Sequence, residues 1–458
     1  MSVANISCRV AIVGSGPAAM YAAEQLLEQH DIEVSIDIFE RLPTPWGLVR
    51  AGVAPDHPEK KLVVDRQFGF VFKRPEIRFF GNVEVGKHIR HSELTDWYDA
   101  VFYATGASSD TRLGIPGEEE LDGCWAAREF VAWYNGHPDY SNLKFDLSCK
   151  RAIVVGNGNV AIDVARILTM PVDELERTDI ADYALEALRN SKIEEVVLLG
   201  RRGHLQGAFN NPELEELEHI KGVDVVVEAD DLPEANEVVL DDADWVTRRK
   251  VVTLQRLAKS VPTAGNKRIV FRFLSSPIEL VGNGRVEQVL VVANHLVHDE
   301  NGQLQPRATE KESLLDAGLI LRAIGYRGTP FPGLPFDSRY GVIENEGGRV
   351  IDQGRPLKGV YVTGWIKRGA KGVIGSNKKC ARDTVQCFLK DLKNNQLNIS
   401  ALNYMEVADL VAERQPNVVD KKAWGKIDHQ ERVAGRAQNR PRVKLTAVHE
   451  MLAVAGGN

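Results

Sequence analysis

The chain has 458 residues, of which 43% are hydrophobic and 26% charged, and its formal net charge is −7 at pH 7. A chain of this length exceeds one ordinary hydrophobic core, so we expect two or three globular domains. The acidic balance argues against nucleic acid or an anionic membrane as the main partner. No apolar run approaches the roughly 18 residues that span a bilayer. Because Met1 leads almost directly into an apolar strand at residues 9–13, we expect no targeting peptide.

The first motif is a glycine fingerprint that follows this strand. The run Arg-Val-Ala-Ile-Val at residues 9–13 is typical of a parallel strand covered on both faces. The turn after it reads Gly14-Ser15-Gly16-Pro17-Ala18-Ala19, and we expect a helix from there to about residue 29. In such a turn the first glycine makes the bend, the second lets the backbone approach a pyrophosphate, and a third small residue permits close packing. The helix N-terminus favours the phosphate anion.

An acid follows the first fingerprint. Glu40 closes the next expected strand, at residues 34–39. A carboxylate at this place accepts hydrogen bonds from ribose 2′- and 3′-hydroxyls but repels a 2′-phosphate. Strand, turn, helix, strand and acid in this order are much more specific than a lone glycine motif. The first site therefore suits FAD or NAD.

A second fingerprint follows the expected strand at residues 152–155. It reads Gly156-Asn157-Gly158-Asn159-Val160, and a strand at residues 195–199 comes before Arg201 and Arg202. Guanidinium groups at this place complement a 2′-phosphate, whereas an acid would select NAD. The alternative is a solvated pair of arginines. We expect one added helix at about residues 173–189. The two motifs together predict FAD and NADPH in one chain, and hence an electron-transfer enzyme.

The cysteines are scattered and form no Cys-x-x-Cys motif. They are Cys8, Cys124, Cys149, Cys380 and Cys387. This pattern excludes a disulfide framework, a thioredoxin-like dithiol and any common iron–sulfur ligation within the chain, so we predict no metal site. Reduced cysteines favour a cytoplasmic location.

The apolar strands outline the domains. A strand at residues 100–103 ends the first nucleotide unit, and residues 110–117 resemble a crossover linker. We interpret the later strands at residues 319–324 and 359–363 as returns to the first domain. The predicted fold is α/β, with two Rossmann-like three-layer domains. A discontinuous FAD domain comprises residues 1–108 and 325–458, and the NADP domain, residues 109–324, is inserted in it.

One loop and several polar side chains are candidates for contact with the cofactors. The loop containing Gly372, Val373 and Ile374 feeds a helix at about residues 381–392, whose N-terminal dipole would favour an anionic reduced flavin; an ordinary loop is the alternative. His57 lies in a stiff loop and can orient a nicotinamide or move a proton, although a structural histidine is equally compatible. Glu213 and Glu216 are three residues apart, so we expect them on one helix face, with surface acids as the alternative.

A basic set lies in the second domain of this acidic chain. An acidic protein partner is one interpretation, and a solvated face of strands is the other. Its members are Arg248, Arg249, Lys250, Arg256, Lys259, Lys267, Arg268 and Arg272.

At this point the sequence resembles a known family, the adrenodoxin-reductase type of NADPH–ferredoxin reductase, and most of all its actinobacterial ferredoxin–NADP(+) reductases. The resemblance covers essentially the whole chain. It is carried by both fingerprints and by the segments at residues 43–58, 200–203, 271–277 and 364–369. The loop Pro-Thr-Pro-Trp-Gly-Leu-Val-Arg-Ala-Gly-Val-Ala-Pro-Asp-His-Pro at residues 43–58 is far more specific than a glycine motif.

The resemblance implies a glutathione-reductase-like pair of domains and a set of ligand contacts. For FAD it implies Ala18, Glu40, Leu48, Val85, Trp365 and the backbone of Gly372–Ile374. For NADP it implies Asn157–Val160, Arg201, Arg202, Glu213 and the Gly372 region. It also implies that His57 and Glu216 form an active-site couple. The family often has an NADP-contacting arginine after the Ala-Thr-Gly turn; Thr111 occupies that column here, so its neighbour Arg112 is the candidate.

The predicted reaction is that of an FAD-dependent NADPH–ferredoxin oxidoreductase. Hydride passes from NADPH to FAD, and single electrons then pass to a separate acidic iron–sulfur ferredoxin, which docks near Arg248, Arg249 and Lys250. A flavin monooxygenase, a quinone or diaphorase-type reductase, and a non-catalytic NADP-sensing flavoprotein are the alternatives. Hydroxylated product would identify the first, and failure to reduce any one-electron acceptor would identify the last.

Overall fold

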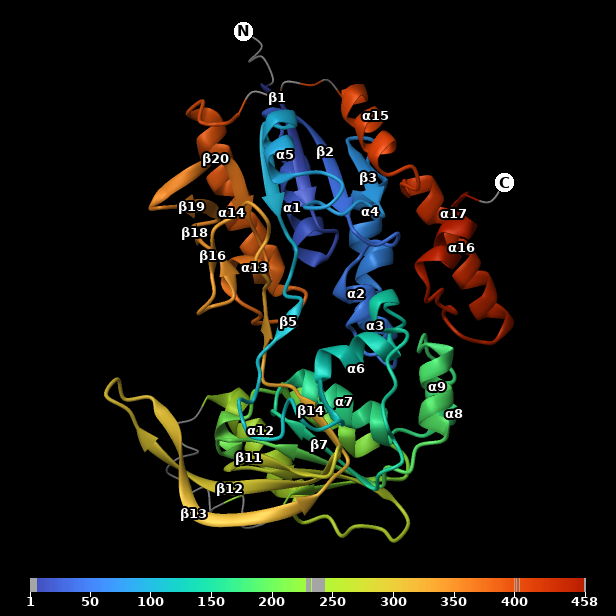
Figure 1. Cartoon of the computed structure of the whole chain (residues 1–458), viewed down its shortest axis with the longest axis vertical. Helices are drawn as coiled ribbons and strands as arrows, with labels where there is room; N and C mark the ends of the chain where they lie inside the picture. Colours follow the sequence, from blue (N-terminus) through green and yellow to red (C-terminus); the bar gives the residue numbers. More distant parts are fainter. Residues whose placement is uncertain are drawn as a thin grey trace. The chain divides into compact units, whose positions relative to one another are not determined.

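The computed structural model describes residues 6–227, 232, 244–398, 400, 402 and 404–456. The chain divides into two compact units (Figure 1). Unit 1 comprises Met1–Val53, His57–Ser109 and Gly325–Asn458, and unit 2 comprises Ala54–Asp56 and Asp110–Ile324. The chain therefore leaves unit 1 and returns to it.

Unit 1 is built on a seven-stranded sheet in the order β18-β19-β20-β4-β1-β2-β3. The five strands from β20 to β3 run parallel, and β18 and β19 extend the sheet by antiparallel pairing. The strands of the seven-stranded sheet are β1 (Ile6–Val13), β2 (Ile32–Glu40), β3 (Ile77–Gly81), β4 (Ala100–Tyr103), β18 (Asn345–Glu346), β19 (Arg349–Asp352) and β20 (Arg355–Val362). Unit 1 also has the short strands β15 (Tyr326–Arg327), β16 (Phe336–Asp337) and β17 (Val342–Ile343). The short β5 (Ser109–Asp110) lies at the boundary of the units.

Helices cover both faces of this sheet. The helices of unit 1 are α1 (Pro17–Leu27), α2 (Leu48–Ala51), α3 (Pro58–Lys61), η1 (Val64–Phe68), α4 (Gly69–Lys73), α5 (His91–Trp97), α13 (Trp365–Arg368), α14 (Ser376–Lys393), α15 (Tyr404–Arg414), α16 (Lys421–Ala437) and α17 (Val448–Gly456). Alternate strand residues pack against α1, α14 and α16 on one face and against α5 and α15 on the other. The continuous apolar strands thus form the middle of three layers.

Unit 2 is built on a six-stranded sheet in the order β6-β14-β7-β8-β10-β9, which is parallel throughout. Its strands are β6 (Cys124–Ala126), β7 (Arg151–Val155), β8 (Glu195–Leu199), β9 (Val223–Val227), β10 (Lys267–Arg272), β11 (Ser275–Gly282), β12 (Val286–His298), β13 (Leu304–Asp316) and β14 (Leu319–Arg322). Its helices are α6 (Ala127–Tyr134), η2 (Pro138–Tyr140), α7 (Asn159–Thr169), α8 (Val172–Leu175), α9 (Asp182–Arg189), η3 (His204–Gln206), α10 (Asn211–Glu216), η4 (Leu217–His219) and α12 (Trp245–Leu257).

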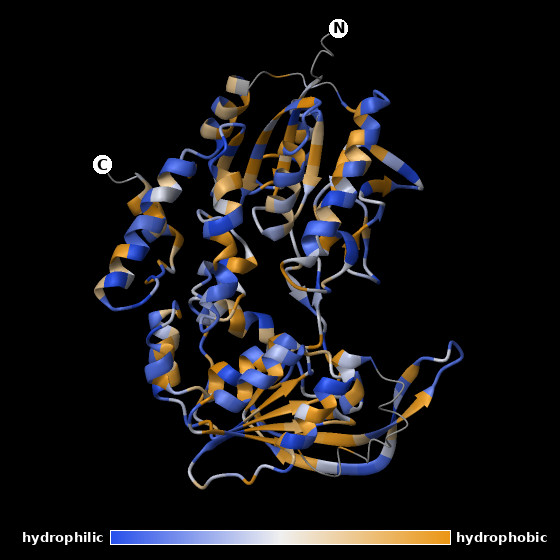
Figure 2. Ribbon diagram, turned by 180° about the vertical axis from the view of Figure 1, so that it is seen from behind, coloured by the Kyte–Doolittle hydropathy of each residue, from blue (hydrophilic) through white to orange (hydrophobic). Residues whose placement is uncertain are grey.

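The two faces of this second sheet are covered differently. One face packs against α6, α7, α10 and α12. The other packs against the antiparallel sheet β11-β12-β13. Figure 2 shows the strands of both parallel sheets largely orange, while the covering helices carry blue and orange along their length. This pattern follows from sheets covered on both faces by amphipathic layers.

Two expectations about elements are wrong in detail. The strand expected at residues 319–324 does not return to unit 1: it is β14, which pairs between β6 and β7 in unit 2. The single helix expected at residues 173–189 is two short helices, α8 and α9, because residues 176–181 leave the helical path. The return to unit 1 is made by β20, which pairs with β4.

Candidate functional site at the carboxyl edges of the two parallel sheets

The first glycine turn lies between β1 and α1, at the carboxyl edge of the unit 1 sheet. Gly14 has φ 101°, and a Cβ on it would lie 2.6 Å from the carbonyl oxygen of Ala104. Only glycine fits this left-handed, crowded position. A Cβ on Gly16 would meet only the Cα of Gly47, at 3.9 Å. The backbone of the turn is therefore open to the close approach that a pyrophosphate requires.

Glu40 is fixed beside this turn. Its Oε2 accepts hydrogen bonds from Ser15 N (3.1 Å) and Ser15 Oγ (2.7 Å), and its Oε1 accepts one from Leu42 N (3.1 Å). The carboxylate is half-buried, and its oxygens have lone pairs left for further donors. The structure thus positions an oriented acceptor where ribose hydroxyls are expected.

The proline-rich loop after Glu40 packs onto the first fingerprint. Trp46 N donates to Ser15 O (3.2 Å), and Trp46 holds φ 88°, which is unusual for a bulky side chain. A Cβ on Gly47 would lie 3.0 Å from Gly16 Cα. Leu48, the first residue of α2, is 38% exposed beside this contact. Leu48, for which the family resemblance implies a contact with FAD, therefore lies next to the glycine turn.

Trp365 follows β20 at the same edge of the sheet, although it is far from the first glycine turn in sequence. A Cβ on Gly364 would lie 2.5 Å from Ala18 Cβ, so the turn after β20 touches α1. The Trp365 ring packs against Tyr326, with ring centroids 5.6 Å apart, and its Nε1 is buried without a hydrogen-bond partner in the described part of the chain. Buried donors of this kind are normally hydrogen-bonded, so Trp365 Nε1 fits an acceptor on a ligand, such as a flavin oxygen or nitrogen.

The Gly372 loop and Val85 differ in what they offer. Gly372 has φ 83°, and Val373 is 55% exposed just before α14 begins at Ser376. This segment presents backbone and an apolar side chain at a helix N-terminus. The side chain of Val85 instead belongs to the core of unit 1, at 7% exposure. Its predicted contact with FAD must therefore come mainly from its backbone.

The second glycine turn repeats the geometry of the first in unit 2. Gly156 has φ 129°, and a Cβ on it would lie 2.4 Å from Ala323 O. Gly158 is the N-cap of α7, and a Cβ there would meet nothing within 4 Å. The turn is braced from the side, since Ala208 N donates to Asn157 O (3.1 Å) and Asn210 N donates to Asn159 Oδ1 (2.8 Å).

Arg201 and Arg202 follow β8 with fixed backbones and exposed side chains. Arg201 O accepts from Asn294 Nδ2 (3.0 Å), and Arg202 O accepts from Leu274 N (3.1 Å). Neither guanidinium makes an ion pair within the described residues. Two positioned cations without an internal carboxylate fit the recognition of a phosphate. Arg112, the other cationic candidate, is also exposed.

The candidate acids and the histidine have distinct surroundings. Glu213 is buried in α10, whereas the half-exposed Glu216 ends that helix. His57 is buried and its Nδ1 lies 2.8 Å from Lys60 Nζ. An ammonium can only donate, so Nδ1 accepts and Nε2 carries the proton of the neutral ring. His57 belongs to unit 1 and Glu216 to unit 2, so their pairing stays a prediction.

Arg166 is a residue that sequence reasoning missed. It lies on α7 with 2% exposure and forms ion pairs with Asp56, with Asp163 (2.7 Å) and with Glu216 (3.8 Å). Burial disfavours its charge, but the carboxylates of Asp163 and Asp56 outweigh this effect and raise its pKa. The available signal is a pair of opposite charges three residues apart, Asp163 and Arg166, in a helical run that is largely apolar.

The basic set divides into exposed and buried members. Arg249 pairs with Glu215 (2.6 Å) and Arg256 with Glu218 (2.7 Å), both on the surface. Lys250 is only 8% exposed, so its expected role in docking a protein is wrong. The alternative of a face of strands is also wrong for residues 248–256, which lie on α12.

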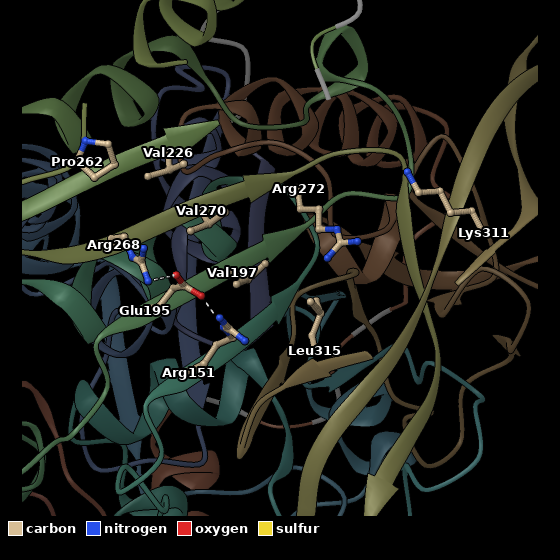
Figure 3. Close-up of a pocket in the computed structure, with 10 residues that line it drawn as sticks. All are labelled: Arg151, Glu195, Val197, Val226, Pro262, Arg268, Val270, Arg272, Lys311 and Leu315. Carbon is tan, nitrogen blue, oxygen red and sulfur yellow. Dashed lines mark hydrogen bonds and ion pairs between the residues drawn. The ribbon is translucent and has the colours of Figure 1, made fainter. Parts of the chain in front are cut away.

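A cavity of about 420 Å³ lies elsewhere in unit 2 (Figure 3). Arg151, Glu195 and Arg268, from the amino ends of β7, β8 and β10, form part of its wall. In Figure 3 Glu195 bridges the two arginines. Residues 156–160 of the second fingerprint are not among the residues that line this cavity.

Within the described residues, no His, Cys, Asp and Glu side chains converge in a group that would hold a metal ion. The five cysteines are free thiols. In the same part of the chain, no helix has the length and apolar character to cross a membrane.

Two units that each present a glycine turn at the carboxyl edge of a parallel sheet define an oxidoreductase of the two-dinucleotide class. A family model described as pyridine nucleotide-disulphide oxidoreductase matches residues 8–231. NADPH-ferredoxin reductase FprA of Mycobacterium tuberculosis is 48% identical, over 98% of this chain and 99% of that protein. The mitochondrial NADPH:adrenodoxin oxidoreductase of Arabidopsis thaliana is 39% identical, over 99% and 96%.

A solved structure supports the same relationship. The structure of Mycobacterium tuberculosis FprA in complex with NADPH matches with a TM-score of 0.95 and 47% identity, and covers 98% of this chain and 100% of that one. The chain belongs to the NADPH–ferredoxin reductase family. This confirms the family resemblance and the predicted α/β fold class.

Proposed function

We propose that the chain is an FAD-dependent NADPH–ferredoxin oxidoreductase. The observation that carries the proposal is the difference between two equivalent positions: a fixed carboxylate, Glu40, follows the first glycine turn, and the exposed pair Arg201 and Arg202 follows the second. A carboxylate suits a free ribose and paired guanidiniums suit a 2′-phosphate. Membership of the family supports this assignment.

The residues of unit 1 fit FAD. The open backbone at Gly16, the Glu40 acceptor and the buried Trp365 donor lie at one edge of the sheet. In unit 2, Asn157–Val160 would bind the pyrophosphate of NADP(H), Arg201 and Arg202 its 2′-phosphate, and Glu213 its ribose. FAD, when bound, accepts electrons in pairs and releases them singly, which nicotinamide does not do.

His57 is proposed to hold the proton that accompanies hydride transfer. The Lys60 ammonium donates to Nδ1, so the neutral ring carries its proton on Nε2. Glu216 is proposed as its partner acid. Arg166, which binds both Glu216 and Asp56, would then orient Glu216 and the residue that precedes His57 in the chain.

The electron acceptor is proposed to be an acidic iron–sulfur ferredoxin that docks on α12. This helix exposes Arg248 and Arg249 together with Trp245 (69% exposed) and Val252 (57% exposed). An aromatic and aliphatic centre with cations around it is typical of a docking surface for an acidic protein. The reaction is assigned to the cytoplasm, in line with the five free thiols.

One assay tests the function. Purified protein should show flavin absorbance and should reduce cytochrome c with NADPH only slowly until ferredoxin is added. NADPH should outperform NADH at equal concentration. Absence of flavin, or a preference for NADH, would refute the proposal.

A charge reversal tests the docking surface. Arg248→Glu should raise KM for ferredoxin about 10-fold at low salt, and the difference should shrink as ionic strength rises. Lys422→Glu, at an exposed position of α16, is the matched control and should leave KM for ferredoxin unchanged. Equal effects of the two reversals would show that α12 is not the docking surface.

A further inference from the structure

Lys250 lies on the buried face of α12. The proposed reaction assigns no role to its charge. The side chain is 8% exposed, and Nζ donates to the carbonyl oxygen of Gly207. It also lies 5.0 Å from the centre of the Phe209 ring, within range of a cation–π contact. Burial lowers the pKa of this lysine, and Asp244 opposes the shift. A buried ammonium is costly unless its partners compensate, so these contacts hold it in one place.

The backbone that Lys250 holds is the loop at residues 207–210. Two residues just after the bonded carbonyl donate to the second fingerprint: Ala208 N donates to Asn157 O (3.1 Å), and Asn210 N donates to Asn159 Oδ1 (2.8 Å). The next residue in the chain makes a second hydrogen bond to α12, since Asn211 Nδ2 donates to Val246 O (3.0 Å). The loop is therefore bonded to α12 on one side and to the glycine turn on the other.

We propose that Lys250 is a positioning residue for NADP(H): it anchors the loop at residues 207–210, which in turn holds the pyrophosphate-binding turn of unit 2. This inference rests on the proposed function. Lys250 acts on the part of the site that binds the pyrophosphate, which NADPH and NADH share. Arg201 and Arg202 act on the 2′-phosphate, which only NADPH carries. The two kinds of residue therefore predict different patterns of loss.

Lys250→Met in the flavin-loaded protein removes the ammonium and keeps most of the volume. We expect the Kd for NADP+ by calorimetry, and KM for both NADPH and NADH, to rise by about 10-fold, which corresponds to about 1.4 kcal/mol. The NADPH/NADH preference, kcat at saturating NADPH and the flavin spectrum should be unchanged. Lys250→Arg keeps a donor and should show a smaller rise. Lys221→Met, at an exposed position before β9, is the matched control and should bind normally.

Three results would overturn the inference. One is an unchanged Kd for NADP+ in Lys250→Met. Another is a loss confined to NADPH, which would place Lys250 at the 2′-phosphate. The third is a loss of flavin or of folding in both Lys250→Met and Lys250→Arg, which would show a general structural role. If the unaltered protein itself fails to bind NADP+, the proposed function fails instead, so the two failures are distinguishable.

Discussion

At the scale of single residues, a carboxylate follows the first glycine turn and two guanidinium groups follow the second. Glu40 accepts from Ser15 in the first turn, whereas Arg201 and Arg202 are exposed and make no ion pair within the described chain. Under the proposed assignment, these residues give two similar folds different nucleotide preferences, because one or two side chains would decide which ribose each unit accepts.

Replacement of both arginines tests this view. In the double variant Arg201→Ala/Arg202→Ala, two charge-assisted phosphate contacts are lost, so KM for NADPH should rise about 100-fold, on the basis of about 1.5–3 kcal/mol per charged hydrogen bond. KM for NADH should stay within about twofold, because it lacks the 2′-phosphate. Steady-state kinetics with both nucleotides give the answer. If the ratio of KM for NADPH to KM for NADH is unchanged, the assignment of Arg201 and Arg202 to the 2′-phosphate is wrong.

The two glycines of the second turn should respond differently to alanine. Gly156→Ala places a Cβ 2.4 Å from Ala323 O at a left-handed φ, so we expect it to lower Tm and weaken NADP+ binding together. Gly158→Ala meets no atom within 4 Å in the protein, so it should leave Tm unchanged and weaken only NADP+ binding, by obstructing the ligand. Thermal melts with calorimetric titrations separate the outcomes; equal Tm losses would contradict the geometry.

Residues with a local signal were predictable from sequence, and those defined by distant contacts were not. Glu40, Arg201 and Arg202 stand at fixed places after glycine turns, so spacing alone indicates them. Arg166 and Lys250 depend on partners far along the chain: Asp56 for the first and Gly207 for the second. A basic residue on a helix is usually solvated, and only the packed structure shows these two to be buried.

At the scale of elements, the C-terminal helix α16 is tied to the loop that carries Leu48. Glu431 of α16 has no exposed side-chain surface and pairs with Arg50 of α2 (2.5 Å) and with Arg442 (2.9 Å). Burial would raise the pKa of Glu431, but Arg50 and Arg442 outweigh it and lower the pKa. The pairs therefore fix α2, whose first residue Leu48 lies beside the first glycine turn.

Loss of this carboxylate should destabilise unit 1. Glu431→Gln leaves the buried Arg50 guanidinium without its anion, whereas Arg442 keeps its ion pair with Asp428 (2.9 Å), so we expect a loss of about 3–5 kcal/mol in the free energy of unfolding at neutral pH. Because the folded pKa is lowered, this stabilisation is present above the unfolded value of about 4.3 and is lost as the pH falls through the folded pKa. Urea unfolding of both proteins across pH should show their difference shrinking below about pH 4.3. A constant difference would contradict the role of the charge.

Element type was predictable where the apolar pattern is strong. Strands β4 and β8 occur at the expected residues, and both fingerprint helices begin at their turns. The third layer of unit 2, the sheet β11-β12-β13, was not predicted; β13 is exposed along most of its length and its sequence has few apolar residues to mark an alternation. Helix α12 was not recognised as a helix either. Its N-cap Asp244, which accepts from Thr247 N (2.9 Å), is a signal that could have found it.

At the scale of the whole molecule, the chain forms two units. The last strands and helices of unit 1 come after all of unit 2 in the sequence. Strand β20 pairs with β4 in unit 1, although the whole of the six-stranded sheet lies between them in sequence. This discontinuity brings Gly364, the residue before Trp365, against Ala18 at the first glycine turn. The FAD site and the NADP site are thus proposed as separate units of one enzyme, whose electrons leave for a partner that holds the iron–sulfur cluster.

The most direct test of the account is an anaerobic reduction of the purified flavin-bound protein by NADPH, followed by addition of oxidised ferredoxin. We expect NADPH to bleach the flavin absorbance at least ten times faster than NADH at equal concentration, on the basis of about 1.4 kcal/mol or more from the 2′-phosphate contacts. Ferredoxin should then restore the flavin absorbance while it becomes reduced. Equal bleaching by the two nucleotides, or a flavin that stays reduced with ferredoxin present, would contradict the account.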